Sequence, residues 1–213
     1  MRFHPIRRRQ FYVVLALAIL MAWPTLAVAQ EGNNPYGEWR YQSADAWGTR
    51  YSPVDQVNAT NFTDLEVAWI WRADNYGPGL EYTMRSTPVY ADGVLYTVAG
   101  QRRQVVAIDP GTGETLWTFR EPQTTRYLRS PRRDFGKGIA YAEVDGRGVV
   151  YVTSPSFFLW ALDAKTGRPM EGWGSPVSLD GFAETGVIDL IPDLIRDWGP
   201  WEDWTGGPYD PDY

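Results

Sequence analysis

The stretch QVVAIDPGTGETLWTF, residues 104–119, decides the fold that we predict for this chain. It opens with VVAI, residues 105–108, a run rich in the β-branched residues that favour strands. The sequence DPGTG, residues 109–113, follows, and such a cluster of Asp, Pro and Gly forms a turn. Strand-forming residues return at 115–119, TLWTF. The stretch therefore predicts two antiparallel strands joined by a tight turn.

A second copy of this unit lies at residues 159–170, LWALDAKTGRPM. The two copies share an Ala-x-Asp-x-x-Thr-Gly core, which begins at Ala107 and again at Ala161, 54 residues later. In the first copy Trp117 follows the core glycine, Gly113, by four residues. Such internal similarity is typical of repeat architectures, in which each repeat is one supersecondary unit.

Each copy falls within a series of predicted antiparallel strands. Asp-Gly pairs at 92–93 and 145–146, each between β-rich runs, are strong hairpin signals. The predicted strands are 87–90, 94–98, 105–108 and 115–119, then 138–143, 149–153, 158–162 and a weaker one near 170–173. A further strand is predicted at 65–72, with Trp69 and Trp71 on one face.

The fold class that follows is all-β. The 11 Trp, 13 Tyr, 21 Gly and 16 Pro favour short strands and many turns over helices. Four-stranded meanders in series are typical of β-propeller blades, which repeat about every 40 to 45 residues. An insertion at 120–136 accounts for the longer spacing. Because a blade cannot bury both faces alone, we predict an incomplete propeller of about two blades.

Residues 1–29 are predicted to be a signal peptide. They combine a basic head at Arg2 and 7–9, an apolar run at 11–22 and an Ala-x-Ala cleavage site at 27–29. The apolar run is shorter than the roughly 20 residues of a spanning helix, so cleavage is favoured over an uncleaved membrane anchor. Arg8-Arg9 also fits a twin-arginine signal, so both the Sec and the twin-arginine routes stay open. Either route predicts a periplasmic protein.

The mature chain is expected to begin near Gln30 with an N-terminal wrapping segment, residues 30–64. Residues 65–213 are assigned to the incomplete propeller, and within them 174–213 form an acidic, aromatic connecting tail. Residues 186–190 could begin the link to a third blade. The tail could instead bind a partner, but a connecting loop is the interpretation that we favour.

Composition excludes several kinds of chemistry. Removing residues 1–29 takes away four Arg and no acid, so the net charge changes from −6 to −10, which argues against a nucleic-acid partner. The single histidine, His4, lies in the signal, and there is no cysteine. The mature segment therefore offers no disulfide, no Cys or His metal site and no Ser-His nucleophile. Its carboxylates suit a hard cation such as Ca²⁺ better than zinc.

The paired turns, with Trp117 after the first, resemble the tryptophan-docking repeats of the pyrroloquinoline quinone (PQQ)-dependent, or quinoprotein, alcohol and glucose dehydrogenases. The likeness covers roughly residues 36–195 in family order, with support from 39–58, 86–96, 137–141 and 159–166. It is closest to the glucose dehydrogenase-like branch at Arg85-Ser-Thr-Pro and at 99–103. The adjacent cysteine pair of the alcohol and methanol dehydrogenases is absent, which argues against that branch.

The resemblance implies that this chain is the N-terminal portion of an eight-bladed propeller, in which each docking tryptophan stacks on the neighbouring blade. It also implies PQQ and Ca²⁺ on the propeller axis. An alcohol or sugar hydroxyl would be oxidised there by hydride transfer, and the electrons would pass to a quinone or cytochrome acceptor. The family's catalytic Asp and Ca²⁺ ligands lie in later, downstream blades, beyond Tyr213. We therefore assign no catalytic residue and no metal ligand here.

Three residues are candidates for binding the cofactor. Lys137 and Thr153 match positions near the quinone in the family, whereas Arg85 stands where many alcohol-oxidising members have Glu and could hold a cofactor carboxylate if it faces the axis. Lys137 stands where the family's Arg-Gly-x-Ala-Tyr motif has its arginine, Arg85 precedes the inner strand of the first blade, and Thr153 ends a strand near the quinone. A cationic cluster within 120–137 agrees with an anionic cofactor, because PQQ is a polycarboxylate that guanidinium groups match. The cluster comprises Arg120, Arg126, Arg129, Arg132, Arg133 and Lys137.

Other interpretations stay open at these positions. The arginines could be solvated or paired with surface acids. Arg85 could be a charge at a strand edge, and Thr153 an ordinary strand residue. At the level of the whole protein, one rival is a non-catalytic propeller for binding or outer-membrane assembly. The other is an inactive fragment whose apolar sheet faces are exposed.

Overall fold

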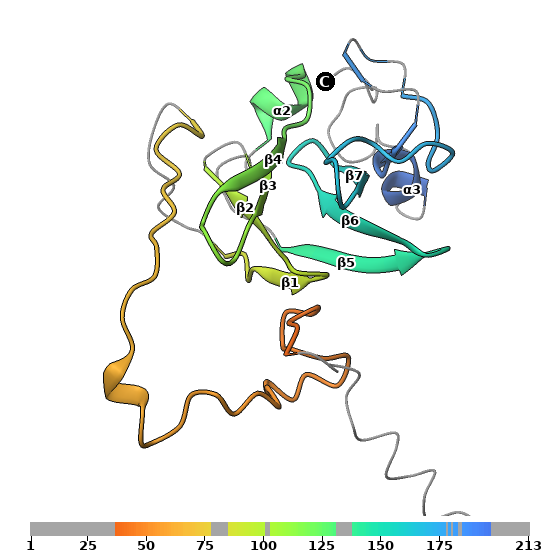
Figure 1. Cartoon of the computed structure of the whole chain (residues 1–213). Coiled ribbons are helices and arrows are strands. Elements are labelled where there is room, and N and C mark those ends of the chain that lie inside the picture. Colours follow the sequence, from red (N-terminus) through yellow and green to blue (C-terminus); the bar gives the residue numbers. More distant parts are fainter. Residues whose placement is uncertain are drawn as a thin grey trace, which may run out of the picture.

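The computed structural model describes residues 37–77, 85–100, 103–130, 138–177, 179, 181–182 and 185–196. They form two four-stranded antiparallel sheets, which fan out side by side (Figure 1). The first sheet comprises β1 (Val89–Ala91), β2 (Val94–Ala99), β3 (Gln104–Ile108) and β4 (Thr115–Phe119). The second comprises β5 (Ile139–Val144), β6 (Arg147–Thr153), β7 (Phe158–Asp163) and β8 (Val187–Asp189). The helices are η1 (Phe62–Asp64), α2 (Thr125–Arg129) and α3 (Ile191–Arg196). The predicted all-β class is confirmed.

Both Asp-Gly hairpins form as predicted. The φ angles are +49° and +75° at Asp92 and Gly93, and +50° and +72° at Asp145 and Gly146. Positive φ at both central residues is what a two-residue type I′ turn requires, and Asp-Gly adopts it readily. The turns set the register of the pairs β1–β2 and β5–β6.

The main core lies between the two sheets. Tyr96, Phe158 and Trp160 are its largest buried side chains. The rings of Tyr96 and Tyr141 stack across the interface with centroids 5.8 Å apart. Smaller clusters cover each sheet's other face, and on the first sheet the covering residues include Trp69 and Trp71. Each sheet is thus buried on both faces over part of its area, as expected for a blade.

The predicted fourth strand of the second sheet, near residues 170–173, is wrong. After Asp163 the chain makes isolated bridges at Pro169, which has no N–H to donate to a ladder, and at Gly174, but no strand among the described residues before β8. Gly172 and Gly174, with φ of +75° and +81°, then turn the chain away. The chain returns as β8, which pairs with β7. Residues that suggested a link to a third blade therefore complete the second.

The strand predicted at 65–72 is also wrong, although its tryptophans face the first sheet together as expected. In the described part of the chain this extended segment has no strand partner. The indole nitrogen of Trp69 donates to the Pro110 carbonyl oxygen at 2.8 Å, and that of Trp71 donates to Thr115 Oγ1 at 2.9 Å. The side-chain contacts therefore hold the segment on the sheet without a backbone ladder.

Tryptophan docking occurs twice among the residues that the structure describes. Trp117 Nε1 donates to the Ala164 carbonyl oxygen at 2.9 Å, and its ring fills the space where a side chain on Gly167 would lie. Trp69 contacts Pro110 and Gly113 in the same way, since a Cβ on Gly113 would lie 2.8 Å from its Cδ2 atom. The expected stacking of a docking tryptophan on the next blade is thus confirmed. The role of Trp69 was not predicted, because no docking turn precedes it.

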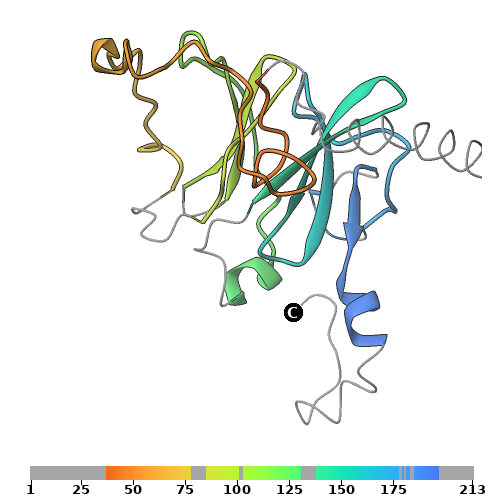
Figure 2. The same cartoon turned by 90° about the horizontal axis from the view of Figure 1, so that it is seen from below.

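The antiparallel order gives the sheets two distinct ends. The turn end carries the hairpin turns and both docking turns. The insertion end carries residues 85–88, 120–130, 153–157 and 189–196, and α2 and α3 both lie on that side of the sheets (Figure 2). The N-terminal segment joins the free edge of β1, where Trp39 and Tyr90 exchange two backbone hydrogen bonds of 2.9 Å. Among the helices of the described residues, none has the length and apolar character needed to cross a membrane.

Candidate functional site

Two of the three predicted cofactor residues lie at the insertion end. Arg85 lies four residues before the start of β1 and Thr153 is the last residue of β6, and both residues are exposed. β1 starts and β6 finishes at this end because neighbouring strands run in opposite directions. Lys137 lies outside the described residues, but Gly138, the next residue, begins β5's approach at the same end.

The docking turns lie at the opposite end and are structural, as predicted. Asp109 Oδ1 accepts backbone hydrogen bonds from Gly111 at 2.7 Å and Thr112 at 3.0 Å. The second copy repeats this arrangement around Asp163. Burial acts to raise the pKa of Asp163, but the hydrogen bonds from Thr166 and Arg147 outweigh it and lower that pKa. The carboxylates of both turns therefore stabilise the turns by accepting hydrogen bonds from the backbone within them.

The arginines of the insertion were expected to face an anionic cofactor, but Arg126 does not. Arg126 is buried, with 6% of its surface exposed. Its guanidinium group forms a bidentate pair with Asp189, at 2.9 and 3.1 Å, and donates to the Ser156 carbonyl oxygen at 3.3 Å. It also lies over the ring of Phe158, 4.7 Å from the centroid. For this arginine, pairing with an acid was the correct interpretation.

The remaining members of the cationic cluster divide into two groups. Arg120 and Arg129 lie in the described insertion and are exposed. Arg132, Arg133 and Lys137 lie outside the described residues. The prediction that the cluster receives a polycarboxylate therefore stays a prediction for these residues.

Glu121 is a buried acid that the sequence did not single out. It is 7% exposed, and its Oε1 atom accepts a hydrogen bond of 2.9 Å from Ser156 Oγ. Burial raises the pKa of Glu121, against the opposing effect of the polar groups of Ser154, Ser156 and Trp160. Its Oε2 atom has no hydrogen-bond partner among the described residues. Glu121 is buried because the fold brings the β6–β7 turn, with Ser156, against it. No local sequence pattern could reveal this burial.

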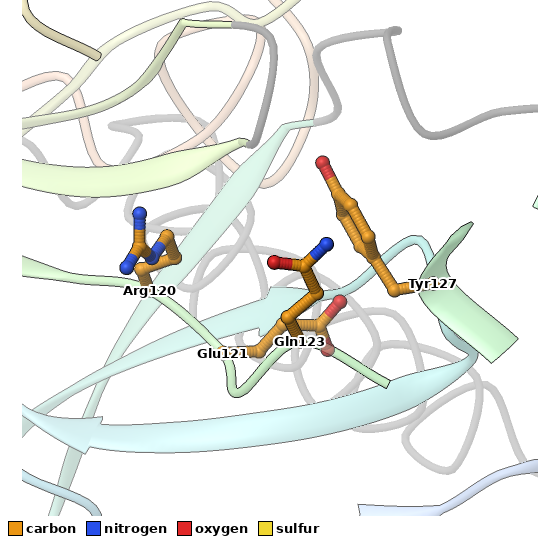
Figure 3. Close-up of a pocket in the computed structure, with 4 residues that line it drawn as sticks. All are labelled: Arg120, Glu121, Gln123 and Tyr127. Atoms are coloured by element: carbon orange, nitrogen blue, oxygen red, sulfur yellow. The ribbon is translucent and has the colours of Figure 1, made fainter. Parts of the chain in front are cut away.

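A small pocket opens beside this carboxyl. It is lined by Arg120, Glu121, Gln123 and Tyr127, which come from the segment after β4 and from α2 (Figure 3). Its size suits a molecule as small as water, and Glu121 offers an unpaired acceptor for one. The pocket is too small for a fused-ring quinone, so such a cofactor would have to lie on the open insertion end.

The described residues fit the carboxylates of PQQ in donor chemistry. The exposed guanidinium of Arg85 can form paired hydrogen bonds to a carboxylate, and the hydroxyl of Thr153 can donate one. Over the described ranges, no group of three or more Asp, Glu, His or Cys side chains is placed to hold a metal ion. The expectation that Ca²⁺ ligands lie beyond Tyr213 remains a prediction.

Two four-stranded antiparallel sheets, joined by a docked tryptophan at equivalent turns, define blades of a β-propeller. A family model described as "PQQ: Glucose/ethanol/alcohol dehydrogenase, beta-propeller domain" matches residues 39–195. The chain therefore belongs to the PQQ-dependent dehydrogenase β-propeller family.

Individual relatives agree with this assignment. The chain is 36% identical over 138 residues to the 1-butanol dehydrogenase (cytochrome c) of Thauera butanivorans, covering 62% of this chain and 18% of the relative. It is 32% identical over 172 residues to the quinohemoprotein alcohol dehydrogenase ADH IIB of Pseudomonas putida, covering 77% and 23%. The crystal structure of the quinohemoprotein alcohol dehydrogenase from Comamonas testosteroni matches 70% of this chain and 23% of its own, with 31% identity and a TM-score of 0.47. The chain thus spans about a fifth of the length of these relatives.

Proposed function

We propose that this chain is the N-terminal part of a PQQ-dependent dehydrogenase that oxidises a CH–OH donor. The observation that carries the proposal is the family match over residues 39–195, supported by the docking of Trp117 on the second blade. When bound, the quinone supplies the oxidant, which accepts a hydride from the substrate carbon.

The roles of this chain's own residues are binding and orientation. Arg85 offers a guanidinium fork and Thr153 a hydroxyl donor at the insertion end. Lys137 would add a point charge in place of the family's arginine, which keeps the attraction and loses the fork. The general base and the Ca²⁺ ligands would come from downstream blades.

The substrate class is an alcohol or sugar hydroxyl, and the sequence around Arg85 favours a glucose-like sugar. The relatives named above are alcohol dehydrogenases, so primary alcohols belong in the same assay. The name of the Thauera enzyme includes cytochrome c, which favours a cytochrome over a free quinone as electron acceptor. We further propose export to the periplasm by the Sec or the twin-arginine route.

The downstream blades are the structural partner in this proposal. Trp69 contacts the first blade as Trp117 contacts the second, yet Trp117 belongs to an outer strand and Trp69 to a segment with no strand partner in the described ranges. A further sheet beside residues 65–72 would supply that partner. The exposed Val67 and Ile70, at 77% and 75%, would then be covered.

Reconstitution of the polypeptide that contains this chain tests the function. The apo-protein is incubated with PQQ and Ca²⁺, and reduction of cytochrome c or a dye is followed with glucose or 1-butanol. The proposal predicts oxidation that depends on both quinone and substrate. Quinone binding should weaken in the double variant Arg85→Ala, Lys137→Ala and strengthen in Lys137→Arg. A protein that binds no quinone would instead support a non-catalytic propeller.

A further inference from the structure

Three segments of the chain converge on one buried serine at the insertion end. Ser156 is fully buried in the turn between β6 and β7. Its hydroxyl donates to Glu121 Oε1 at 2.9 Å, and its carbonyl oxygen accepts from Arg126 at 3.3 Å. Arg126 in turn holds Asp189, the last residue of β8. The insertion, the β6–β7 turn and the end of β8 are therefore joined by one network of polar contacts.

The network fixes the local geometry of each segment. Thr124 caps α2 by accepting a hydrogen bond of 3.0 Å from the Tyr127 backbone, which orients Arg126 on the helix. Asp189 Oδ1 also accepts from the backbone of Ile191, at 3.0 Å, at the start of α3. A guanidinium fork meets a carboxylate in one plane, so the pair fixes orientation as well as distance.

The β6–β7 turn held by this network begins directly after Thr153. Within it Phe157 has a φ of +64°, a backbone conformation that costs energy for a residue with a side chain. The Phe157 carbonyl oxygen accepts from the backbone of Leu190 at 3.0 Å, next to Asp189. The strained turn is thus supported by the same segment that Arg126 holds.

We propose that Arg126 and Asp189 are positioning residues of the quinone site: their bidentate pair, acting through the β6–β7 turn, sets Thr153 in the arrangement that binds the cofactor. The inference rests on the proposed function. Arg126 acts through the turn, since its guanidinium is buried and occupied by Asp189 and Ser156.

Conservative variants distinguish positioning from simple charge attraction. Arg126→Lys keeps the positive charge and removes the fork. Asp189→Asn removes a negative charge, which by electrostatics alone would strengthen the binding of an anionic quinone. If the pair positions the site, both variants should weaken binding. A loss of binding in both variants, although one leaves the local charge unchanged and the other makes it more positive, is the signature of geometry.

Arg147 and Asp163 provide the matched control. They form an Arg–Asp contact of 3.2 Å in the same sheet, at the turn end. Arg147→Lys and Asp163→Asn therefore make the same chemical changes far from the proposed site.

The experiment measures PQQ binding to the apo-form of the complete polypeptide by tryptophan fluorescence, well below the unfolding temperature of every variant. We expect Arg126→Lys and Asp189→Asn to raise the Kd about tenfold, the lower end of what losing an orienting partner costs, and to shift the absorption maximum of bound PQQ. The control variants should match the wild type. Wild-type Kd and spectrum in Arg126→Lys and Asp189→Asn, or equal losses in the controls, would overturn the inference. A wild-type protein that binds no PQQ would overturn the proposed function itself.

Discussion

The indole nitrogen of Trp117 donates a hydrogen bond of 2.9 Å to the carbonyl oxygen of Ala164, so an outer-strand residue of the first blade is fixed to the docking turn of the second. Trp117→Phe should lower the free energy of unfolding by about 1 kcal/mol, because it removes this bond and keeps an aromatic ring at the contact. Trp117→Ala should cost about 3 kcal/mol. Urea unfolding measures both. Leu116→Ala, at a neighbouring side chain that is 50% exposed, is the control and should have little effect.

Gly167 should tolerate no side chain. A Cβ there would collide with the Trp117 ring, and φ is +69°. Gly146 has a similar φ of +72° but open space around it, so it isolates the backbone contribution. We expect Gly146→Ala to cost about 1 kcal/mol through backbone strain, and Gly167→Ala to cost about 1 to 3 kcal/mol more through overpacking. Equal losses of unfolding free energy in the two variants would argue against tight docking at Gly167.

Most of the fold could be predicted from the sequence because its signals are local. The Asp-Gly pairs dictate their turns, and the repeated Ala-x-Asp-x-x-Thr-Gly core dictates the docking turns around Asp109 and Asp163. The location of β8 could not be predicted this way. β8 pairs with β7 only after the long loop that follows Pro169. Local strand propensity does not determine which segment pairs with β7 after such a loop.

The candidate site was less accessible to sequence reasoning. The pattern of a cationic cluster does not say which members are buried, and Arg126 is used internally because the fold brings Asp189 to it from 63 residues away. The docking of Trp69 could not be predicted for a related reason, because its partner in the turn, Pro110, lies 41 residues later in the sequence. Arg85 and Thr153 could be placed at one end because strand direction alone determines it.

The raised pKa of Glu121 predicts a dependence of stability on pH. An acid whose pKa is higher in the folded than in the unfolded state stabilises the fold below its unfolded pKa, about 4.3, and loses that contribution as pH rises through the folded value. Stability from Glu121 should therefore fall as pH increases above about 4. Glu121→Gln should remove this component of the pH dependence. Urea unfolding of both proteins from pH 4 to pH 8 is the measurement, and parallel curves would contradict the prediction.

Trp69 should hold residues 65–72 on the first sheet. Trp69→Ala removes the indole contact with Pro110 and Gly113, so we expect faster tryptic cleavage after the exposed Arg72. Ile70→Ala is the control, because that side chain is 75% exposed and should leave the cleavage rate unchanged. Cleavage that is equally fast in the wild type and in Trp69→Ala would show that the indole does not anchor the segment.

Equilibrium titration of the apo-polypeptide with PQQ, followed by tryptophan fluorescence, determines whether these blades belong to a quinone-binding protein. If these blades belong to a quinone-dependent dehydrogenase, the signal should saturate with increasing quinone, and the double variant Arg85→Ala, Thr153→Ala should need a higher concentration to reach the same point. A fluorescence signal that does not saturate with PQQ, in a polypeptide that is folded by circular dichroism, would contradict the claim.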